Sequence, residues 1–321
     1  MGGIVGLGGG IGASRLWRVL ARAAGPSRLT LVVSTAGDLR LHGLRISPEV
    51  DTTLYALSGR LDAERGWGLR DETFRCMEML SALGGPGWFR LGDQDLATHL
   101  FRTGLLADGH TLTEFTARLA ASLGVRSRVL PMSDHEVTTR ITTTDGRLLH
   151  YQEYLVREQA AAGVRAVRFD GIGTAQPAPG VLAAIESADL IVLGPSNPVA
   201  SMLPILGLPG VTRALEQRRE RVVAVSPVVA SVPVTDEGER RHGQARAALL
   251  AAINLPATAS GVARLYRDVC ARFVYDRADQ GEDTRIKAQG PQPVPADLLP
   301  HRGAAPGSLL AILLGNTVIR P

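Results

Sequence analysis

The sequence predicts an α/β fold: a doubly wound, mainly parallel, Rossmann-like sheet with a helical and β-rich insertion. The chain opens with an apolar run at 3–7, a glycine-rich loop and a helical pattern. A second apolar run at 29–34 completes a βαβ unit, in which the two strands are parallel. The alternation of helices and strands resumes after residue 179. We therefore expect residues 1–321 to form a single α/β domain that contains the insertion at 58–170.

The first half of the chain is predicted to be mainly helical after its opening βαβ unit. Apolar residues recur at helical spacing over 13–24, and Ser47-Pro48 precedes a helix at 51–57. Three further helices begin at candidate N-caps, namely Asp71 (a helix to residue 83), Asp93 (to 105) and Thr111 or Thr113 (to 123).

The second half is predicted to pass from strands back to the α/β alternation. Beyond residue 126 apolar side chains recur at every second position, which is typical of strands, and Asp145-Gly146 marks a hairpin turn. These strands are expected at 126–130, 137–143, 148–156 and 164–169. Helices at 179–187, 211–218, 242–254 and 258–271 then alternate with strands at 189–193, 222–225 and 272–275. A long loop at 278–306 and a last helix at 308–314 complete the prediction.

Composition excludes several classes of protein. Hydrophobic residues make up 45% and charged residues 21% of the chain, as in ordinary globular proteins. No apolar run approaches the ~18 residues of a membrane-spanning helix, and the N-terminus has no secretory-signal pattern. Cys76 and Cys270 lie far apart, which argues against a disulfide framework and against a zinc site built from cysteine pairs. We expect a cytoplasmic protein that does not enter a membrane.

The charge pattern favours small anionic ligands over nucleic acid. The formal net charge is +4, the basic residues are scattered among acids, and Lys287 is the only lysine. Aromatic residues make up 4%, too few for an obvious base-stacking surface. Guanidinium groups match the geometry of phosphate and carboxylate. We therefore expect an anionic small molecule as ligand.

The glycine loop at 8–12 predicts contact with a phosphate or a nucleotide. A strand, glycines and a helix N-terminus bring backbone N–H groups and the positive end of the helix dipole toward an anion, and a Cβ would block close approach. The loop lacks the third glycine of GxGxxG, and the second strand ends at Ser34-Thr35 instead of at an acid. These departures argue against a dehydrogenase, and the missing lysine excludes a P-loop. The alternative is a tight turn that binds nothing.

Two acids follow the second predicted strand, near the edge where such sheets bind ligands. Asp38 comes directly after the strand, and Asp51 opens the next helix. Carboxylates beside a phosphate loop are typical of a Mg²⁺ site, because bare carboxylates would repel the phosphate. An N-cap role for Asp51 is the alternative.

A third candidate segment, Gly-Pro-Ser-Asn-Pro at 194–198, follows the strand at 189–193. Ser196 and Asn197 can donate hydrogen bonds to a phosphate or a base, and Ser226-Pro227 follows the next strand in the same way. A stiff turn is the alternative for an Asn-Pro pair. The histidines show no metal-type spacing, although His99 could face either the core or a site, and no GxSxG segment indicates a serine hydrolase.

Taken together, these segments resemble the 2-phospho-L-lactate transferases of coenzyme F-420 biosynthesis, including the bacterial members that use enolpyruvate. The matching segments occur in family order at 9–15, 46–55, 64–68, 71–73, 91–99, 130–134, 151–153, 194–198 and 225–227. They include Gly-Gly-Ile-Gly-Ala-Ser-Arg, Leu-Gly-Asp-Gln-Asp-Leu-Ala-Thr-His and Gly-Pro-Ser-Asn-Pro. It is the ordered set, more than any one segment, that is specific.

The resemblance implies a phosphoryl transfer. A guanosine diphosphate that carries lactate, enolpyruvate or glycerate would give its three-carbon phosphoryl group to the terminal ribityl hydroxyl of the deazaflavin Fo, with release of GMP and a requirement for Mg²⁺. Catalytic and metal-binding roles are implied for Asp38 and Asp51. Contacts with the nucleotide are implied for Gly9, Gly10, Gly12, Arg15, Gln94, Ser196, Asn197 and Ser226. A homodimer is also implied.

Three departures from the family pattern support a second hypothesis. Gly37 stands where family members usually carry an acid, and Gln94 stands in place of an arginine. Residues 235–238 bring two acids to a segment where an anion contact is expected. The second hypothesis is therefore a non-catalytic regulator that binds a nucleotide or sugar nucleotide on the same scaffold. The missing acid also predicts weaker metal binding, because one ligand is lost, but no loss of the metal, because Mg²⁺ commonly binds only one or two carboxylates.

Overall fold

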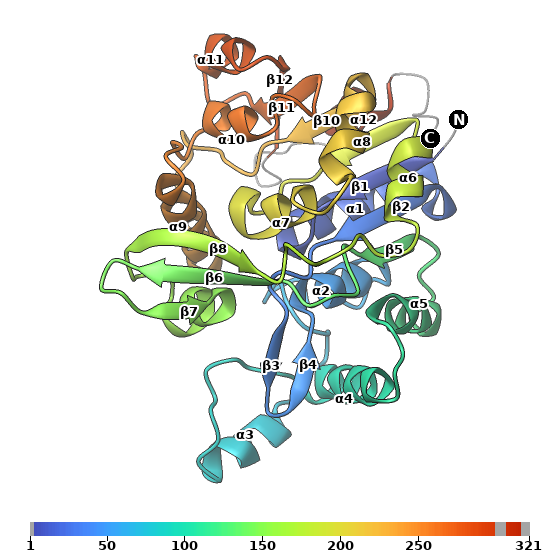
Figure 1. Cartoon of the computed structure of the whole chain (residues 1–321), viewed down its shortest axis with the longest axis vertical. Helices are drawn as coiled ribbons and strands as arrows, with labels where there is room; N and C mark the ends of the chain where they lie inside the picture. Colours follow the sequence, from blue (N-terminus) through green and yellow to red (C-terminus); the bar gives the residue numbers. More distant parts are fainter. Residues whose placement is uncertain (1–2, 299–305, 316–321) are drawn as a thin grey trace.

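A seven-stranded parallel sheet forms the centre of the molecule (Figure 1). The computed structural model describes residues 3–298 and 306–315. The strand order is β12-β11-β10-β9-β1-β2-β5, and every neighbouring pair is parallel. The strands are β1 (Ile4–Leu7), β2 (Leu29–Val33), β5 (Arg128–Pro131), β9 (Leu190–Leu193), β10 (Val222–Val225), β11 (Arg272–Asp276) and β12 (Gln292–Ala296).

The order of these strands confirms the predicted doubly wound, Rossmann-like fold. From β1 the chain builds outward through β2 to β5, and it then returns to build the other half from β9 to β12. β1 and β9 therefore lie side by side at the point where the strand order reverses. Open α/β sheets bind their ligands at the carboxyl ends of the strands at this point.

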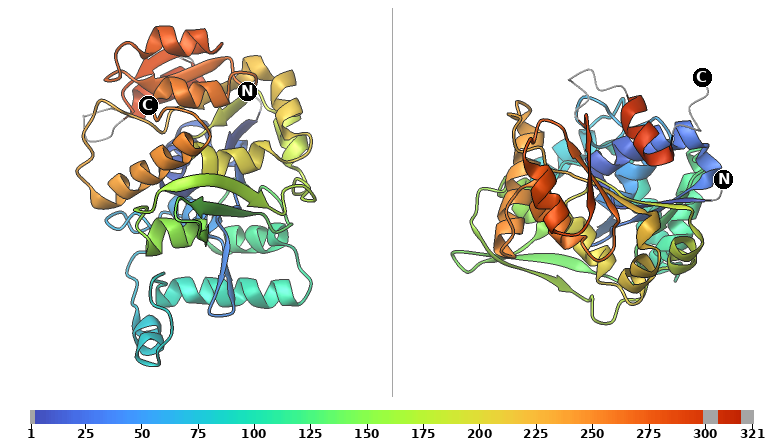
Figure 2. Two further views of the ribbon diagram at one scale, coloured as in Figure 1. Left: turned by 60° about the vertical axis from the view of Figure 1, so that its left-hand side comes forward. Right: turned by 90° about the horizontal axis from the view of Figure 1, so that it is seen from above.

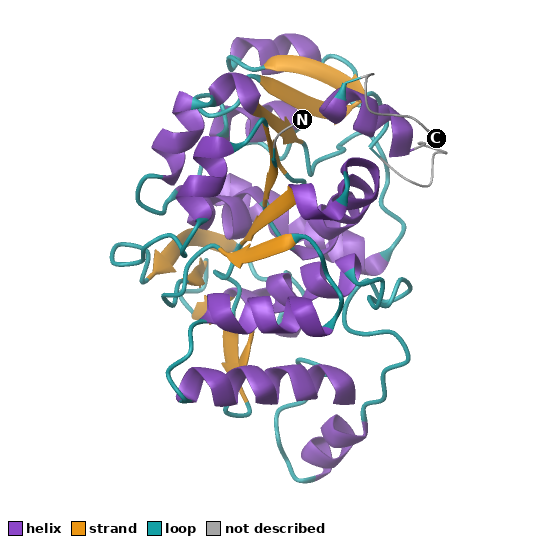
Figure 3. Cartoon of the chain, turned by 90° about the vertical axis from the view of Figure 1, so that its right-hand side faces the viewer, coloured by secondary structure: helices purple, strands orange, loops and turns teal. Residues whose placement is uncertain are grey.

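Side chains of the strands alternate between two hydrophobic cores, one on each face of the sheet. In β9, for example, Leu190 and Val192 join one core, while Ile191 and Leu193 join the other. Strands that are buried on both faces are continuous apolar runs, which is why the sequence predicts them well. Figure 3 shows helices on both sides of the sheet.

Each core is closed by its own set of helices. The first face is covered by α1 (Gly10–Ala24), α2 (Pro48–Leu57), α5 (Leu112–Ser122) and α12 (Pro306–Leu314). The second is covered by α6 (Val181–Ser187), α7 (Leu203–Leu206), α8 (Val211–Gln217), α9 (Glu237–Ala252), α10 (Ala259–Leu265) and α11 (Glu282–Ala288). Short 3₁₀ turns occur at Pro26–Arg28 and Arg219–Arg221, and π-helical turns at Glu153–Arg157 and Pro198–Met202.

Two further pieces extend from the central sheet. An antiparallel sheet of β7 (Leu148–His150), β6 (Thr138–Thr143) and β8 (Val164–Asp170) packs on the second core through residues such as Ile141 and Leu149. A small lobe projects from one end of the molecule (Figure 2). The lobe is built from the hairpin of β3 (Leu39–Leu41) and β4 (Leu44–Ile46), together with α3 (Arg75–Ala82) and α4 (Asp93–Ala107), and it has its own apolar cluster.

The predicted boundaries need four corrections in the region of the insertion and the C-terminal third. β5 lies within 58–170 but pairs with β2, so a strand of the main sheet divides the predicted insertion into a helical and a β-rich part. The strand expected at 148–156 ends at His150, and the chain then turns helical. The helix expected at 258–271 ends at Leu265. The part of the expected loop before residue 299 contains α11 and β12, and residues 299–305 lie outside the described residues.

The predicted helix caps are only partly correct. Thr111 caps α5 in a capping box with Glu114. Asp71 caps no helix and has a positive φ of 57°. Asp93 is the first residue of α4, and its carboxylate accepts hydrogen bonds from the backbone N–H groups of Arg75 and Cys76 at the start of α3. Asp93 therefore accepts hydrogen bonds from the first N–H groups of the preceding helix, across the loop that separates the two helices.

Among the described residues, no single helix combines the length and apolar character needed to cross a bilayer. The segments Pro198–Leu206 and Val211–Gln217 reach that length only as a pair, and they meet at a bend of 85°.

Candidate functional site

Two loops meet at the carboxyl edge of the sheet, where β1 and β9 lie side by side. The glycine loop at 8–12 leads from β1 into α1, and the loop at 194–198 follows β9. Ser196 Oγ donates a hydrogen bond of 2.9 Å to the carbonyl of Gly9. A Cβ at Gly8 would overlap Ser196 Oγ, and one at Gly12 would lie 2.7 Å from the carbonyl oxygen of Pro195. The two loops are therefore in direct contact at this edge of the sheet.

Trp17 holds the glycine loop from the side of the core. Its indole is fully buried and fills the space that side chains at Gly6 and Gly194 would need, with ring carbons 2.6 and 2.7 Å from the positions of their Cβ atoms. Trp17 Nε1 also donates to the carbonyl of Gly8 at 3.3 Å. The Trp17 side chain thus packs against the carboxyl ends of β1 and β9 and against the start of the loop between β1 and α1.

Asp38 is buried and has one engaged and one unengaged carboxylate oxygen. Ser47 Oγ donates to Asp38 Oδ2 at 2.6 Å, and Arg45 Nη2 lies 3.3 Å from the same oxygen. Asp38 Oδ1 has no hydrogen-bond partner among the described residues. Burial raises the pKa of Asp38 to about 6, against the lowering effect of the Arg45 charge. The carboxyl is therefore mainly ionised at neutral pH.

Asp51 lies in the first turn of α2 and faces α4. The N-cap of α2 is Ser47, so the alternative of Asp51 as the cap is wrong. Arg102 donates to Asp51 Oδ1, while Oδ2 lies 3.7 Å from His99 Nδ1 and accepts no hydrogen bond within the described part of the chain. Burial raises the pKa of Asp51, against the charges of Arg102 and His99.

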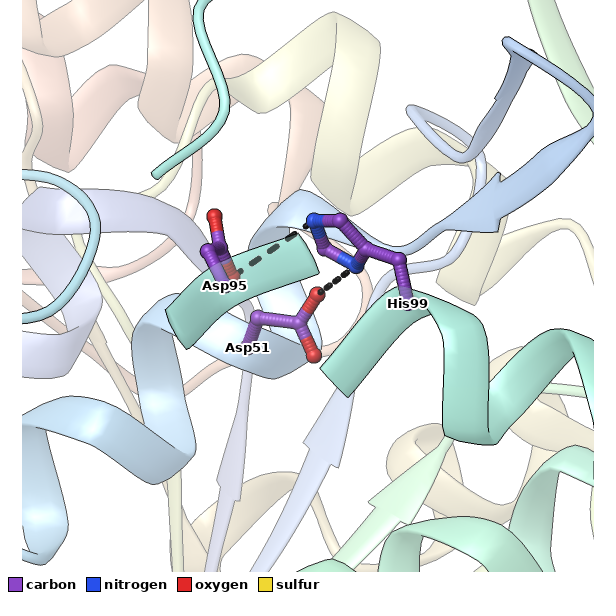
Figure 4. Close-up of side chains that lie close together, drawn as sticks. All are labelled: Asp51, Asp95 and His99. Carbon is purple, nitrogen blue, oxygen red and sulfur yellow. Dashed lines mark ion pairs between the residues drawn. The ribbon is translucent and has the colours of Figure 1, made fainter. Parts of the chain in front are cut away.

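Asp51 forms a buried cluster with Asp95 and His99 of α4 (Figure 4). His99 Nε2 lies 3.5 Å from Asp95 Oδ1, which also accepts a 2.7 Å hydrogen bond from the hydroxyl of Tyr55. One ligand atom from each of the three residues lies within 4.8 Å of the others, a spacing that a metal ion could bridge. Asp38 is not part of this cluster, although the sequence grouped it with Asp51.

Arginines join the two acidic positions into one network. Arg102 is completely buried, and its Nη1 donates to the carbonyl of Arg45 at 3.1 Å, while Nη2 binds Asp51. Arg45 in turn binds Asp38 and Glu136. The guanidinium of Arg102 also lies over the ring of Phe115, 4.6 Å from its centroid. The positions of Asp38 and Asp51 are therefore coupled through two buried guanidinium groups.

Glu49 is a site residue that sequence reasoning missed. It precedes Asp51 by two positions on α2, but its carboxylate turns toward the glycine loop, where a Cβ at Gly9 would lie 2.6 Å from Glu49 Oε2. Ser201 Oγ donates to Oε1 at 3.1 Å, and Oε2 accepts no hydrogen bond from the residues that the structure describes. Burial raises the pKa of Glu49 to about 8. Only its place in Ser-Pro-Glu at the start of a helix could have indicated this role.

The remaining predicted site residues are held by contacts within the protein. Asn197 Oδ1 accepts from the N–H groups of Val199 and Ala200, and Asn197 Nδ2 donates to the hydroxyl of Tyr151 at 3.4 Å. Ser226 closes its own turn through two hydrogen bonds with the backbone of Val228. Both side chains therefore stabilise turns, in the loop after β9 and in the loop after β10. For the Asn-Pro pair, this is the alternative given above.

Arg15 and Gln94 are engaged by different partners within the protein. Arg15, on α1, forms a 2.6 Å ion pair with Glu239 of α9, and both side chains are about half exposed. Gln94 lies at the start of α4, where its side-chain amide donates to the carbonyls of Arg70 and Asp71. Gly10, the first residue of α1, has a φ of 76°, and no atom lies within 4 Å of where its Cβ would be.

Comparison with known proteins adds three findings. The family described as 2-phospho-L-lactate transferase CofD matches residues 4–302 of the chain. A phosphoenolpyruvate transferase of Streptomyces griseus is 41% identical over 292 residues, which cover 89% of each chain. A 2-phospho-L-lactate transferase of Methanosarcina mazei is 36% identical over 291 residues, or 91% of this chain and 92% of the relative.

The fold also has a relative among solved structures. The crystal structure of a UPF0052 family member from Bacillus halodurans superposes with a TM-score of 0.61 and covers 92% of this chain and 93% of its own. The two sequences are 19% identical, so the likeness concerns the fold alone.

Proposed function

Because the chain belongs to the family of the 2-phospho-L-lactate transferase CofD, we propose that it moves a three-carbon phosphoryl group from a guanosine diphosphate donor to the deazaflavin Fo. It is a transferase of the phosphoenolpyruvate and phospholactate type in coenzyme F-420 biosynthesis. In the proposed reaction the terminal ribityl hydroxyl of Fo attacks the phosphorus that carries the three-carbon group. The bond between that phosphorus and GMP breaks, GMP leaves, and the hydroxyl loses its proton.

The observation that carries the proposal is the junction of the two loops at the carboxyl edge of β1 and β9. Here the backbone of Gly9, Gly10 and Gly12 opens α1 without side chains, and Ser196 lies against it. A diphosphate at this position would receive backbone N–H groups and the positive end of the α1 dipole. One buried acid of α2, Glu49, lies next to the same loop, since a Cβ at Gly9 would be 2.6 Å from Glu49 Oε2.

We further propose that Asp38 and Asp51 hold Mg²⁺. Each has one oxygen fixed by protein donors and a second, buried oxygen that accepts no hydrogen bond from the described residues. Unpartnered carboxylate oxygens are suited to a hard cation, so each of the two residues could offer the ion one ligand atom. Bound Mg²⁺ would neutralise part of the charge of the phosphoryl group during transfer. Arg45 and Arg102 keep the two carboxylates in place.

One observation favours the second hypothesis, a regulator that binds the nucleotide without turnover. Arg15 of the glycine-loop helix is already paired with Glu239, and the side chain of Gln94 donates to the carbonyls of Arg70 and Asp71. A donor phosphate would have to displace Glu239 to reach Arg15. A scaffold that binds weakly and does not react would be consistent with these contacts.

Product analysis separates the two functions. The purified protein is mixed with Fo, Mg²⁺ and, in separate reactions, guanosine diphosphate donors that carry lactate, enolpyruvate or glycerate. A transferase forms a phosphodiester of Fo and an equal amount of GMP, which mass spectrometry detects. Binding of donor or Fo with no GMP from any of the three donors would instead support the regulator. Light scattering on the same preparation tests the proposed homodimer.

A further inference from the structure

A cavity of about 680 Å³ lies at the opposite edge of the sheet from the candidate site. It is lined by residues at the amino ends of three neighbouring strands: Arg219 before β10, Arg272 at the start of β11, and residues 290–293 at the start of β12. Lys287 of α11 completes the wall. The glycine loop leaves the carboxyl end of β1, so the two sites are on different edges of one sheet.

The charges that line this cavity are mainly positive. Three cations (Arg219, Arg272 and Lys287) face one acid, Glu220, whose side chain is 84% exposed and whose Oε1 lies 3.5 Å from Arg219 Nη1. In the described part of the chain, Arg272 forms no ion pair and donates only a long hydrogen bond, of 3.5 Å, to the carbonyl of Ile312. Among the described residues, the ammonium group of Lys287 forms no hydrogen bond and no ion pair, and its backbone carbonyl accepts a hydrogen bond from Gly290.

The arrangement concentrates positive charge on separate elements around one space. Arg219 and Arg272 are half-buried, and Arg219 Nη2 is oriented by the carbonyl of Gly290 at 3.3 Å. A concave surface lined by charges of one sign focuses its field on the space between them and attracts counter-ions. Guanidinium groups bind phosphate oxygens in a planar, two-point geometry, and an ammonium group adds a point charge.

We propose that this cavity binds a small polyanion of the phosphate type. Its volume is in the range of about 300–1,000 Å³ of small-molecule sites. The described lining contains arginine, lysine, glutamate, proline, glycine, alanine and glutamine but no aromatic ring on which a base could stack. The cavity therefore recognises the charged group of its ligand, as in orthophosphate, pyrophosphate or a short phosphomonoester.

The sequence itself provides a specific probe, because Lys287 is the only lysine in the chain. An amine-reactive acetyl ester acylates Lys287 and the α-amino group, and peptide mass spectrometry measures both rates. Orthophosphate, pyrophosphate and glycerol 2-phosphate are added in turn, with sodium chloride at equal ionic strength as the reference. At about four times the dissociation constant, the bound polyanion should slow acylation of Lys287 about fivefold, since only the free fraction reacts. The α-amino group should be unaffected.

Two variants and one matched control test the assignment. Arg219→Gln and Arg272→Gln should each weaken the protection of Lys287 several-fold. Arg285→Gln changes the one arginine of α11, which pairs with Glu282 and does not line the cavity, and this variant should keep the protection. Thermal midpoints verify that each variant is folded. If Arg272→Gln, in β11, does not fold, Arg219→Gln still provides the test, because Arg219 lies outside the strands.

Three outcomes would overturn the proposal. They are equal acylation of Lys287 in phosphate and in chloride, protection that survives in both cavity variants, and protection that is lost equally in the Arg285 control. The relative protection by the three probes distinguishes free phosphate from a phosphorylated metabolite. Because the readout is acylation of one amine, it is independent of turnover and of binding at the glycine loop.

Discussion

At the scale of single residues, the two acids proposed as metal ligands share one design. In each, a buried arginine or a serine fixes one carboxylate oxygen and leaves the other without a partner among the described residues. Burying a carboxylate without enough partners destabilises the folded protein. Such an arrangement therefore needs neighbouring positive charges that stay in place. Arg45 and Arg102 provide that network, and neither was identified from the sequence.

Asp51→Asn tests the proposed role of the second acid. The amide oxygen can still accept from Arg102, so we expect the fold to be retained, but the anionic oxygen available to Mg²⁺ is lost. Turnover should fall tenfold or more, at about 1.4 kcal/mol in activation free energy per factor of ten. Asp145→Asn makes the same change at an exposed turn as the control. Wild-type turnover in Asp51→Asn would show that this acid only binds Arg102.

Gly37→Asp tests the departure from the family pattern. The backbone of Gly37 is not in the left-handed region, so a side chain is not excluded by conformation. Its Cβ would lie 3.5 Å from Glu49 Oε1 and 3.3 Å from Gln152 Nε2. An additional carboxyl beside the buried Glu49 must lose its hydration on folding, so we expect a lower thermal midpoint without metal. We also expect Mg²⁺ to raise the midpoint more than it does in the wild type.

Gly37→Asn separates charge from size, because asparagine has the shape of aspartate without its charge. Its midpoint should respond to Mg²⁺ as the wild type does. An equal response of the midpoint to Mg²⁺ in the Asp variant and the wild type would exclude position 37 from the metal site.

At the scale of helices and strands, the site depends on contacts between elements far apart in the chain. The ion pair of Arg15 with Glu239 joins α1 to α9 across 224 positions and occupies the one arginine of the glycine-loop helix that the family resemblance assigns to the nucleotide. Exposed pairs of this kind contribute little to stability, about 0–1 kcal/mol. Such a pair can change the affinity for a competing anion by more than it changes stability, because the anion has to displace the carboxylate from the same guanidinium.

Glu239→Gln is therefore expected to lower the KM for the donor several-fold, with little change in kcat or in thermal midpoint. The reason is that Arg15 no longer has to leave a carboxylate to bind a phosphate. Glu237→Gln, on the same helix and next to Arg241, is the matched control and should leave KM unchanged. If both variants lower KM equally, the change in KM results from the total charge around α9 and not from the ion pair of Arg15.

The elements that could be predicted from sequence are those whose pattern is local. Apolar strands of the main sheet, α1 and the capping box of α5 all carry their signal within a few residues. β12 contains Pro293 and Pro295, which indicate a loop, yet it pairs in parallel with β11 at the edge of the sheet. Proline is tolerated there because an edge strand has one side without partners.

The same distinction applies to the candidate site. The glycine loop and the loop at 194–198 were predicted because each follows a strand that must end at the same edge. The cluster of Asp51 with Asp95 and His99, and the turn of Glu49 toward Gly9, depend on how α2 and α4 pack. Such packing joins positions 40 or more residues apart, and spacing along one sequence carries no signal for it.

At the scale of the whole molecule, the buried acids make stability depend on pH. Burial raises the pKa of Glu49 from 4.5 to about 8 and that of Asp38 from 3.8 to about 6. Between the two values of each group, the folded state holds a proton that the unfolded state releases. These groups therefore stabilise the protein less as pH rises from about 4 to 8, by up to about 1.4 kcal/mol per pH unit for each proton.

We expect Glu49→Gln to flatten this dependence. Its thermal midpoint should be close to that of the wild type at pH 5 and higher at pH 8, because the neutral amide never has to ionise in a buried place. Exposed Glu186→Gln is the control and should follow the wild-type curve. Parallel curves for wild type and Glu49→Gln would contradict the raised pKa.

The packing of Trp17 gives the molecule a built-in optical reporter. The chain has three tryptophans, of which Trp67 and Trp88 follow α2 and α3, while Trp17 donates a hydrogen bond to the glycine loop itself. With Trp67 and Trp88 replaced by phenylalanine, ultraviolet emission would come from a single indole in contact with the carbonyl of Gly8. A change in the brightness or lifetime of that emission would then follow occupancy of the loop in real time, with unlabelled compounds and without any chemical reaction.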